Sequence, residues 1–572
     1  MRLSSIRVQN FRGIKDLALE LEPDITVLIG ENNSGKTSVL EALRVGLDTI
    51  KSDRICNFTE YDFQRTETTD HLSKCENIIL TYVFQENKDY HWDDEVVQAL
   101  NEVIVGDEYS LIKLQVTAWF DNEESECKQE WNFLDDKDNV MTGKQNMLKV
   151  LQRLRPFFFL SAFRNAKQEF QAQSVYWASF LKNKDIDDAK RKTLEQELED
   201  ISRKIVDAHS TFNEVTNEVR RIGDLVSTAK TDPVSIDPAP ADIYRTLRYN
   251  TQLNVLTSEN VKIPVQHHGE GTQSLSVLLL FNAYINSRLK KDVHRLAEPI
   301  IALEEPEAHL HPNAIRSLWG LLHGLSGQKI IATHSGDILS EVPVSNLRRM
   351  SKCSDGICCK ALLKSTLINE ELRKFNHHVR RNRGELLFAK CWILVEGETD
   401  VSVIAECALL LSINLNRHGI RIVEISQAGG PGIFIKVADA LGIQWHVVAD
   451  NDEKGAEYIE NASAYLSGRD LSLHISKLSQ SNIDILLCCN GYGKPYLDGV
   501  PATRASELTA DEGSTEYWSQ VYKIIKKKRN GFSKPAAAME AIMLMSKKGT
   551  DGVPSDIKDI INKAIALAGA FL

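Results

Sequence analysis

Two stretches of the chain end apolar segments in acidic residues that could hold divalent metal. The first, Leu-Val-Glu-Gly-Glu-Thr-Asp, contains Glu396 and Asp400, four residues apart across a predicted strand-to-helix turn. The second, Val-Val-Ala-Asp-Asn-Asp, contains Asp450 and Asp452, which alternate along a strand end and point the same way. Either stretch alone is typical of solvated acids at loop ends. Four converging carboxylates would need hard cations, so we expect two Mg²⁺ or Mn²⁺ ions suited to phosphodiester displacement.

A glycine-rich loop between a predicted strand and a predicted helix indicates a phosphate site. Residues 30–37, Gly-Glu-Asn-Asn-Ser-Gly-Lys-Thr, are a complete Walker A loop. Lys36 would reach the β- and γ-phosphates of ATP, and the Thr37 hydroxyl would hold one Mg²⁺ ion. The predicted nucleotide contacts of this loop are Gly30, Asn33, Ser34, Gly35, Lys36 and Thr37.

Further downstream, an apolar strand over residues 299–303 runs into Glu304 and Glu305, which is a Walker B pattern. The first acid would join the Mg²⁺ shell, although aspartate is more usual there, and Glu305 would orient the attacking water. His334 follows another apolar strand, where it could touch the γ-phosphate. Alone it would be a structural histidine, but the order of motifs favours the switch role.

A third small-residue loop precedes an apolar helix about 25 residues before the Walker B strand. It reads Gly-Glu-Gly-Thr-Gln-Ser-Leu and contributes Gly271, Gln273 and Ser274 as candidate nucleotide contacts.

A long helical pattern lies between the Walker A loop and this third loop. Apolar residues recur there at alternating spacings of four and three, which forms a seam over about four heptads. The seam residues are Leu194, Leu198, Ile201, Ile205, Ala208, Phe212, Val215, Val219 and Ile222. Packing against its own domain and pairing with a second protomer both remain open.

A second α/β pattern begins near Leu386, where strands alternate with helices and predict a parallel sheet. The basic, histidine-rich residues 373–383 between the two patterns suggest a hinge. We therefore predict an α/β chain: a head that carries the Walker motifs and has a helical, coiled-coil-like insertion, followed by a second α/β domain with a parallel sheet. The predicted ranges are 1–180 for the first part of the head, 181–240 for the insertion, 241–375 for the rest of the head and 376–572 for the second domain; the resemblances below imply an ABC-type ATPase head and a Toprim domain.

The first group of motifs resembles ATP-binding-cassette ATPases of the SMC/RecF type. The opening Asn-Phe-Arg-Gly and the long insertion support this branch, and the resemblance adds Arg12 to the nucleotide contacts. In that group two heads sandwich two nucleotides, and each signature loop caps the ATP of the other head. The resemblance therefore implies a homodimer or higher homo-oligomer.

The second group resembles a Toprim domain, and the combination is similar to the OLD (overcoming lysogenization defect) nucleases. The resemblance implies a general base or metal ligand at Glu396, a metal pair at Asp450 and Asp452, and a second acid at Asp400. It also implies an assisting late lysine, for which Lys534 is the candidate. Basic residues 523–529 would then contact the DNA backbone, although a solvated helix face explains them nearly as well.

This resemblance implies a metal-dependent DNA endonuclease with ATPase activity that acts against phage or foreign DNA. Members of the family act alone, beside a helicase-like partner, or beside a reverse transcriptase. The main alternative is a RecF-like DNA-binding repair ATPase whose Toprim domain binds nucleic acid without cutting it. A primase-like polymerase would need a primer-synthesis module, which the sequence does not suggest.

Composition sets the remaining limits. The 572 residues are 42% hydrophobic and carry a formal net charge of −11, which argues against a globally basic DNA-packing protein. No apolar run is long enough for a membrane span, and no secretory signal is visible, so a cytoplasmic protein is expected. The ten cysteines are too sparse for a disulfide scaffold, and those near Cys353, Cys358 and Cys359 are interpreted as buried thiols.

Overall fold

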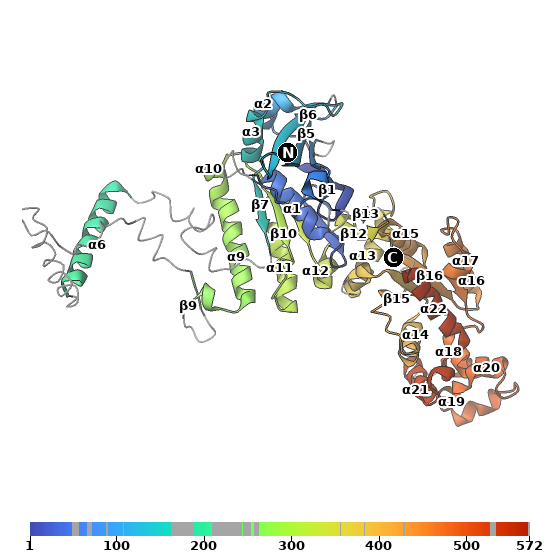
Figure 1. The fold of residues 1–572 in the computed structure, drawn as a ribbon. Helices are drawn as coiled ribbons and strands as arrows, with labels where there is room; N and C mark the ends of the chain where they lie inside the picture. The colour runs from blue at the N-terminus through green and yellow to red at the C-terminus, as the bar shows by residue number, and fades with distance from the viewer. Residues whose placement is uncertain are drawn as a thin grey trace, which may run out of the picture.

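The protein forms two α/β parts that lie side by side (Figure 1). The computed structural model describes residues 1–48, 56–65, 71–86, 90–106, 108–161, 187–208, 243, 253–256, 262–354, 356–382, 384–426, 429–526 and 533–569. The predicted α/β class is confirmed. Within these residues, no helix is both long enough and apolar enough to cross a bilayer.

The first sheet is antiparallel, with strand order β2-β1-β4-β5-β6. Its strands are β1 (Leu3–Phe11), β2 (Ile14–Glu20), β4 (Ile78–Gln85), β5 (Leu111–Asp121) and β6 (Glu126–Leu134). Alternate residues of β4 are buried, as expected for a sheet with one face on a core. Short helices α2 (Asp94–Leu100) and α3 (Asn146–Leu154) lie beside it.

The second sheet has the order β13-β12-β3-β11-β10-β7 and is parallel except for its edge strand β13. Its strands are β3 (Ile25–Gly30), β7 (Phe157–Leu160), β10 (Ile300–Glu304), β11 (Gln328–Ala332), β12 (Leu347–Cys353) and β13 (Gly356–Ala361). All six residues of β3 are buried, as is typical of a central parallel strand. The helices of this layer are α1 (Lys36–Leu47), α9 (Glu270–Tyr284), α11 (Pro312–Gly324) and α12 (Gly336–Glu341).

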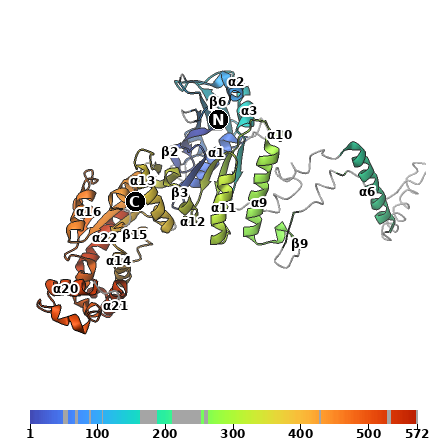
Figure 2. The same ribbon diagram turned by 180° about the vertical axis from the view of Figure 1, so that it is seen from behind.

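Part of the predicted helical insertion is helix α6 (Asp188–Ala208). In both views it lies apart from the three sheets (Figures 1 and 2). Its seam residues Leu194, Ile201 and Ile205 are 41%, 53% and 61% exposed, so they are not packed against their own domain. The seam residues from Phe212 to Ile222 lie outside the described residues.

The third sheet is parallel throughout, with the order β15-β14-β16-β17. Its strands are β14 (Cys391–Val395), β15 (Ile420–Glu424), β16 (Gln444–Ala449) and β17 (Ile475–Lys477). The longer helices of this part are α14 (Glu398–Leu410), α15 (Gly432–Leu441), α16 (Glu453–Ser463), α20 (Thr515–Lys526), α21 (Lys534–Ser546) and α22 (Ser555–Gly569). Shorter helices α17 (Leu471–His474), α18 (Ile483–Leu487) and α19 (Lys494–Leu497) complete it.

The junction between the two parts differs from the predicted hinge. Residues Asn369–Arg381 form helix α13, and its Phe375 is fully buried against Trp392 and Phe434 of the third sheet's layer. A single apolar core includes residues of both parts, so the hinge prediction is wrong. Hydrophobic burial of one face of α13 explains the difference, because its charged residues occupy the other face. The predicted boundary between residues 375 and 376 falls inside this helix.

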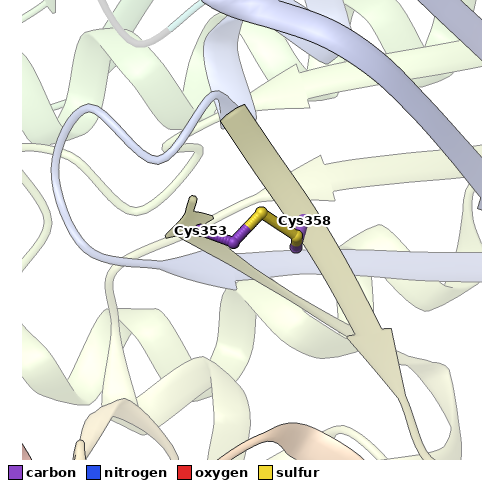
Figure 3. Close-up of a disulfide and its surroundings, with 2 residues drawn as sticks. All are labelled: Cys353 and Cys358. Carbon is purple, nitrogen blue, oxygen red and sulfur yellow. A yellow bond between two sulfur atoms is a disulfide. The ribbon is translucent and has the colours of Figure 1, made fainter. Parts of the chain in front are cut away.

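Two cysteines interpreted as buried thiols form a disulfide. Cys353 and Cys358 are joined across the β12–β13 turn, with Cα atoms 6.1 Å apart (Figure 3). The antiparallel register places Cys353 opposite Gly356 and Cys358 opposite Ser351, which brings the two side chains to the same end of the hairpin. The thiol prediction is therefore wrong for this pair, whereas Cys359 is a half-buried free thiol.

Candidate functional site: a nucleotide pocket and a carboxylate cluster

The Walker A loop connects β3 to α1 in a conformation suited to an anion. Gly35, with φ at 91°, lies so close to Ile357 that a Cβ atom would approach its Cδ1 to 2.5 Å. The Lys36 amine donates to the carbonyl oxygens of Gly30 and Glu31 at 3.0 and 2.8 Å. Burial lowers the pKa of Lys36 to about 8, opposed by the charges of Glu305, Glu304 and Glu31. The loop is thus folded around its own lysine.

The Walker B acids and the switch histidine border the same pocket. A cavity of about 310 Å³ is lined by Asn32, Asn33, Gly35, Lys36, Thr37, Ser38, Glu304, Glu305, Ala332 and His334. The Thr37 hydroxyl donates to Glu304 Oε1 at 2.5 Å, so the two predicted Mg²⁺ ligands are already in contact. His334 Nε2 lies 3.9 Å from Glu305 Oε1. Burial, together with the charge of Lys36, lowers the pKa of His334.

A third acid behind this pocket was not predicted. Glu307 is mostly buried, and its Oε1 accepts hydrogen bonds from the Thr333 hydroxyl and from the backbone N–H of His334. Burial raises the pKa of Glu307. Glu307 therefore holds the segment that carries His334. Its signal was present in the Glu-Glu-Pro-Glu run, but the spacing alone did not distinguish it from a solvated acid.

The signature residues lie outside the nucleotide pocket. Gln273 donates to the carbonyl of His268 at 2.6 Å, and a Cβ on Gly271 would meet the carbonyl of His309 at 2.9 Å. Ser274 lines a smaller adjoining cavity, together with Glu304 and Glu305. Among the described residues that line the nucleotide pocket, none comes from the signature loop.

Arg12 does not line the nucleotide pocket either. It is paired with Asp62 at 2.8 Å and with Glu41 of α1 at 3.5 Å, so it contacts the helix that follows the loop instead of the pocket.

The four predicted carboxylates lie at one edge of the third sheet. Strands β14 and β16 are parallel neighbours, so Glu396 and Asp450 follow adjacent strand ends. Asp400 lies in the first turn of α14 and accepts a hydrogen bond from Gly397 N at 2.8 Å. Asp452 caps the N-terminus of α16 and accepts from Gly455 N at 2.8 Å. The carboxyl ends of parallel strands are where such sheets place ligands.

The charges of these acids act on one another. Burial raises the pKa of Asp400 to about 7, and the charges of Asp484 and Glu396 add to the shift. Burial also raises the pKa of Asp450 to about 8, with further contributions from Asp400, Glu396, Asp452 and Asp484. The acids therefore form one electrostatic cluster that favours a bound cation.

Two members of this site were missed in the sequence. Asp484, at the start of α18, is 5% exposed and accepts a hydrogen bond from the Tyr496 hydroxyl at 2.8 Å. Lys454 donates to Glu396 Oε1 at 2.7 Å. Lys454 had a sequence signal, because it is a basic residue two positions after Asp452. Asp484 comes from a separate segment with no acidic neighbour to mark it, so only the tertiary structure reveals it.

Lys534 is the first residue of α21. Burial raises the pKa of Asp484, and the charge of Lys534 opposes that shift, so Lys534 lies near the cluster. Its amine donates to the Tyr522 hydroxyl at 2.7 Å. Of the predicted basic DNA-contact stretch, Lys523 is exposed on α20, and residues 527–529 lie outside the described residues.

The residues of the cluster fit a divalent cation by their chemistry. All are hard oxygen donors, and Glu396 Oε2 is buried with no hydrogen-bond partner among the described residues. Within the described residues, no group of three or more His, Cys, Asp or Glu side chains is already gathered as a metal cage. Because the Lys454 amine neutralises Glu396, a cation would have to displace it.

These features define the class: a P-loop α/β head joined through a shared core to a domain with a parallel Toprim-type sheet. Residues 1–385 match the family described as "Protein of unknown function (DUF2813)", and the chain belongs to that family. Residues 387–452 match the domain described as "Overcoming lysogenization defect protein-like, TOPRIM domain". The predicted resemblance to the OLD family is confirmed by these matches.

Three curated relatives are similar to the chain. The uncharacterized protein YbjD of Escherichia coli (strain K12) is 31% identical over 304 residues, which are 52% of each chain. The Old nuclease of Escherichia phage P2 is 30% identical over 206 residues, 34% of each chain. The OLD nuclease of Thermus scotoductus is 26% identical over 478 residues, 79% of this chain and 82% of that protein. The match spans about half the length of the first relative and a third of the second.

Proposed function

We propose that this protein is a divalent-metal-dependent DNA endonuclease whose activity is controlled by ATP bound at the head. The observation that carries the proposal is that Glu396, Asp400 and Asp450 follow two neighbouring strands of one sheet and that Asp484 of α18 acts on the latter two, so that burial and mutual repulsion raise the pKa of Asp400 to about 7 and of Asp450 to about 8. A protein that only binds DNA gains nothing from acids that repel the phosphate backbone. The two relatives called OLD nucleases support the same activity.

Glu396, Asp400, Asp450 and Asp452 would hold two Mg²⁺ or Mn²⁺ ions, which would supply a nucleophile and stabilise charge on the phosphate. Glu396 Oε2 is the buried acceptor available to take the proton of the attacking water. Lys534, on the side of Asp484, would offset negative charge on the cleaved phosphate.

In the head, Lys36 would exchange the carbonyls of Gly30 and Glu31 for the phosphates of ATP. Thr37 and Glu304 would hold the accompanying Mg²⁺ ion, which neutralises phosphate charge. Glu305 would orient the attacking water, and His334 borders the same space. The signature residues lie outside this pocket in one chain, which favours a second copy supplying them.

We further propose a homodimer in which the exposed seam of α6 contributes to pairing. Leu194, Ile201 and Ile205 expose apolar surface along the helix, as the core positions of an unpaired coiled coil would. Defence against phage or other foreign DNA is the proposed role. Deleting residues 185–228 should reduce the particle measured by light scattering from two or more copies of the shortened chain to one. An unchanged number of copies would contradict the pairing.

The alternative is a DNA-binding repair ATPase whose Toprim domain does not cut. The ion pair between Lys454 and Glu396 favours it, since a lysine that keeps this place would exclude metal. The test is incubation of supercoiled plasmid with Mg²⁺ or Mn²⁺, with and without ATP. Wild type should nick and linearise the plasmid, Asp452→Ala should not, and Lys36→Ala should lose ATP control while retaining cleavage chemistry. An intact plasmid under every condition would favour the alternative.

A further inference from the structure

The C-terminal helices place one lysine beside the carboxylate cluster. Helix α21 packs against α14, and Cys407 Sγ and Met545 Sδ lie 3.7 Å apart near the C-terminal ends of the two helices. Lys534 is the first residue of α21, and its charge acts on Asp484 of the cluster, where it opposes the effect of burial on the pKa of that carboxyl. The Ser533 side chain caps α21 by accepting from Ala536 N, which fixes where this helix begins.

A tyrosine from a different helix holds the amine of Lys534. The Nζ atom donates to the Tyr522 hydroxyl at 2.7 Å and lies 3.9 Å from the centre of the Tyr522 ring. A lysine has four rotatable side-chain bonds, so two contacts from one rigid ring restrict it strongly. The ring is half-buried on the side of the carboxylates: burial raises the pKa of the Tyr522 hydroxyl, and the charges of Asp484 and Asp450 raise it further.

The second lysine of the site, Lys454, also lies near a tyrosine ring, 5.3 Å from the centre of Tyr458, but its amine donates to an acid as well. Lys454 is paired directly with Glu396 at 2.7 Å, and its side chain is 47% exposed. It is therefore a counter-ion of a proposed metal ligand and has to leave when metal binds. The Lys534 amine, by contrast, donates to a phenol hydroxyl that is not a proposed metal ligand.

We propose that Tyr522 is a positioning residue that holds the Lys534 amine beside the carboxylate cluster, where it meets the phosphate of the cleaved strand. The inference rests on the proposed function for the identity of the phosphate. The contact itself is independent of that function. Loss of the hydroxyl would leave the ring contact, whereas loss of the ring would remove both restraints.

The first experiment needs neither metal nor DNA. The full-length protein is treated with trace acetic anhydride, and the acetylation rate of each lysine is measured by mass spectrometry. Tyr522→Phe should raise the rate at Lys534 about threefold and Tyr522→Leu further, because a freed amine is more accessible. Tyr517→Phe, five residues earlier on α20 and packed against Trp518, is the matched control and should leave the rate unchanged. An unchanged rate in both Tyr522 variants would overturn the proposal.

The second experiment is a double-mutant cycle on plasmid cleavage. Lys534→Ala should lower the rate about 100-fold and Tyr522→Phe about 10-fold, and the double variant should match Lys534→Ala. Independent, multiplying losses would mean that Tyr522 does not act through Lys534, and would overturn the inference. If wild type never cleaves, the proposed function fails while the acetylation rates still decide whether Tyr522 positions the lysine.

Discussion

The nucleotide pocket and the carboxylate cluster both lie at the ends of parallel strands, but their charges are arranged in opposite ways. In the pocket, Lys36 is satisfied by loop carbonyls and Thr37 already contacts Glu304. In the cluster, buried acids face one another, and Lys454 is bonded to Glu396. In the first site, the lysine and the threonine already have polar partners before a ligand binds. In the second, the acids disfavour one another's charged forms, and a bound cation would relieve that repulsion. Their responses to mutation should therefore differ in sign.

The largest effect is expected at the cluster. Asp450→Asn should reduce plasmid cleavage about 10³-fold, because it removes a proposed metal ligand. The same change should raise the unfolding temperature of the metal-free protein by about 2–4 °C. The reason is that burial and neighbouring acids raise the folded-state pKa of Asp450 to about 8, so at neutral pH folding has to protonate a carboxyl that is ionised in the unfolded chain.

Differential scanning fluorimetry, run with EDTA and with Mn²⁺, measures the unfolding temperature of wild type and of the variant. Mn²⁺ should stabilise wild type more than the variant. If the variant is both inactive and less stable than wild type in EDTA, Asp450 does not destabilise the metal-free fold.

The corresponding change in the pocket should affect rate without increasing stability. Glu305→Gln should slow ATP hydrolysis about 100-fold and leave ATP affinity within about twofold, because the side chain orients water and does not hold phosphate. Phosphate release and binding of a fluorescent ATP analogue measure the two quantities. Glu341→Gln, at the end of α12, is the control. If ATP affinity and the rate of ATP hydrolysis fell equally, Glu305 would not act by orienting the attacking water.

The same contrast explains what the sequence could predict. The residues of the pocket lie in short contiguous motifs, and Lys36, Thr37 and Glu304, which those motifs predicted as nucleotide or metal contacts, line one cavity in the structure. Asp484 was missed because α18 reaches the cluster only through the packing of the third sheet. The predicted hinge failed for a related reason: the charged residues of α13 dominate its sequence, whereas its few apolar residues, such as Phe375, decide its packing.

The junction between the two parts provides the next test. Arg349 of β12 is 5% exposed and donates to the carbonyls of Leu441, Gly442 and Ala389 at 3.1, 3.2 and 2.8 Å. Arg349→Met should destabilise the protein by about 2–4 kcal/mol, because these buried acceptors lose their donor. Calorimetry should then show two transitions in place of one. Lys364→Met, at an exposed ion pair with Glu22, is the control, and one unchanged transition would mean that Arg349 does not couple the parts.

A smaller effect is expected from acid at the same junction. Burial lowers the pKa of His378 to about 4, with Arg381 and His377 lowering it and Glu424 opposing the shift. The folded state therefore resists a proton that the unfolded chain accepts below its pKa of about 6.5. Stability should fall as the pH drops from 6.5 towards 4, by about 2 kcal/mol from this residue. His378→Gln should flatten urea-unfolding profiles measured across this range, whereas exposed His377→Gln should not; parallel profiles would contradict the assignment.

The smallest effect is expected from an ion pair between the Walker A loop and the start of the third sheet. Glu31 of the Walker A loop is paired at 3.2 Å with Lys390, the residue immediately before β14. The Glu31 and Lys390 side chains are 61% and 26% exposed, so Lys390→Ala should change stability by less than about 0.5 kcal/mol. If only the buried core couples the nucleotide pocket to the carboxylate cluster, Lys390→Ala should change ATP affinity by less than about threefold. A tenfold change, measured with the fluorescent ATP analogue and absent in Lys364→Ala, would instead place the communication between the sites in this surface pair.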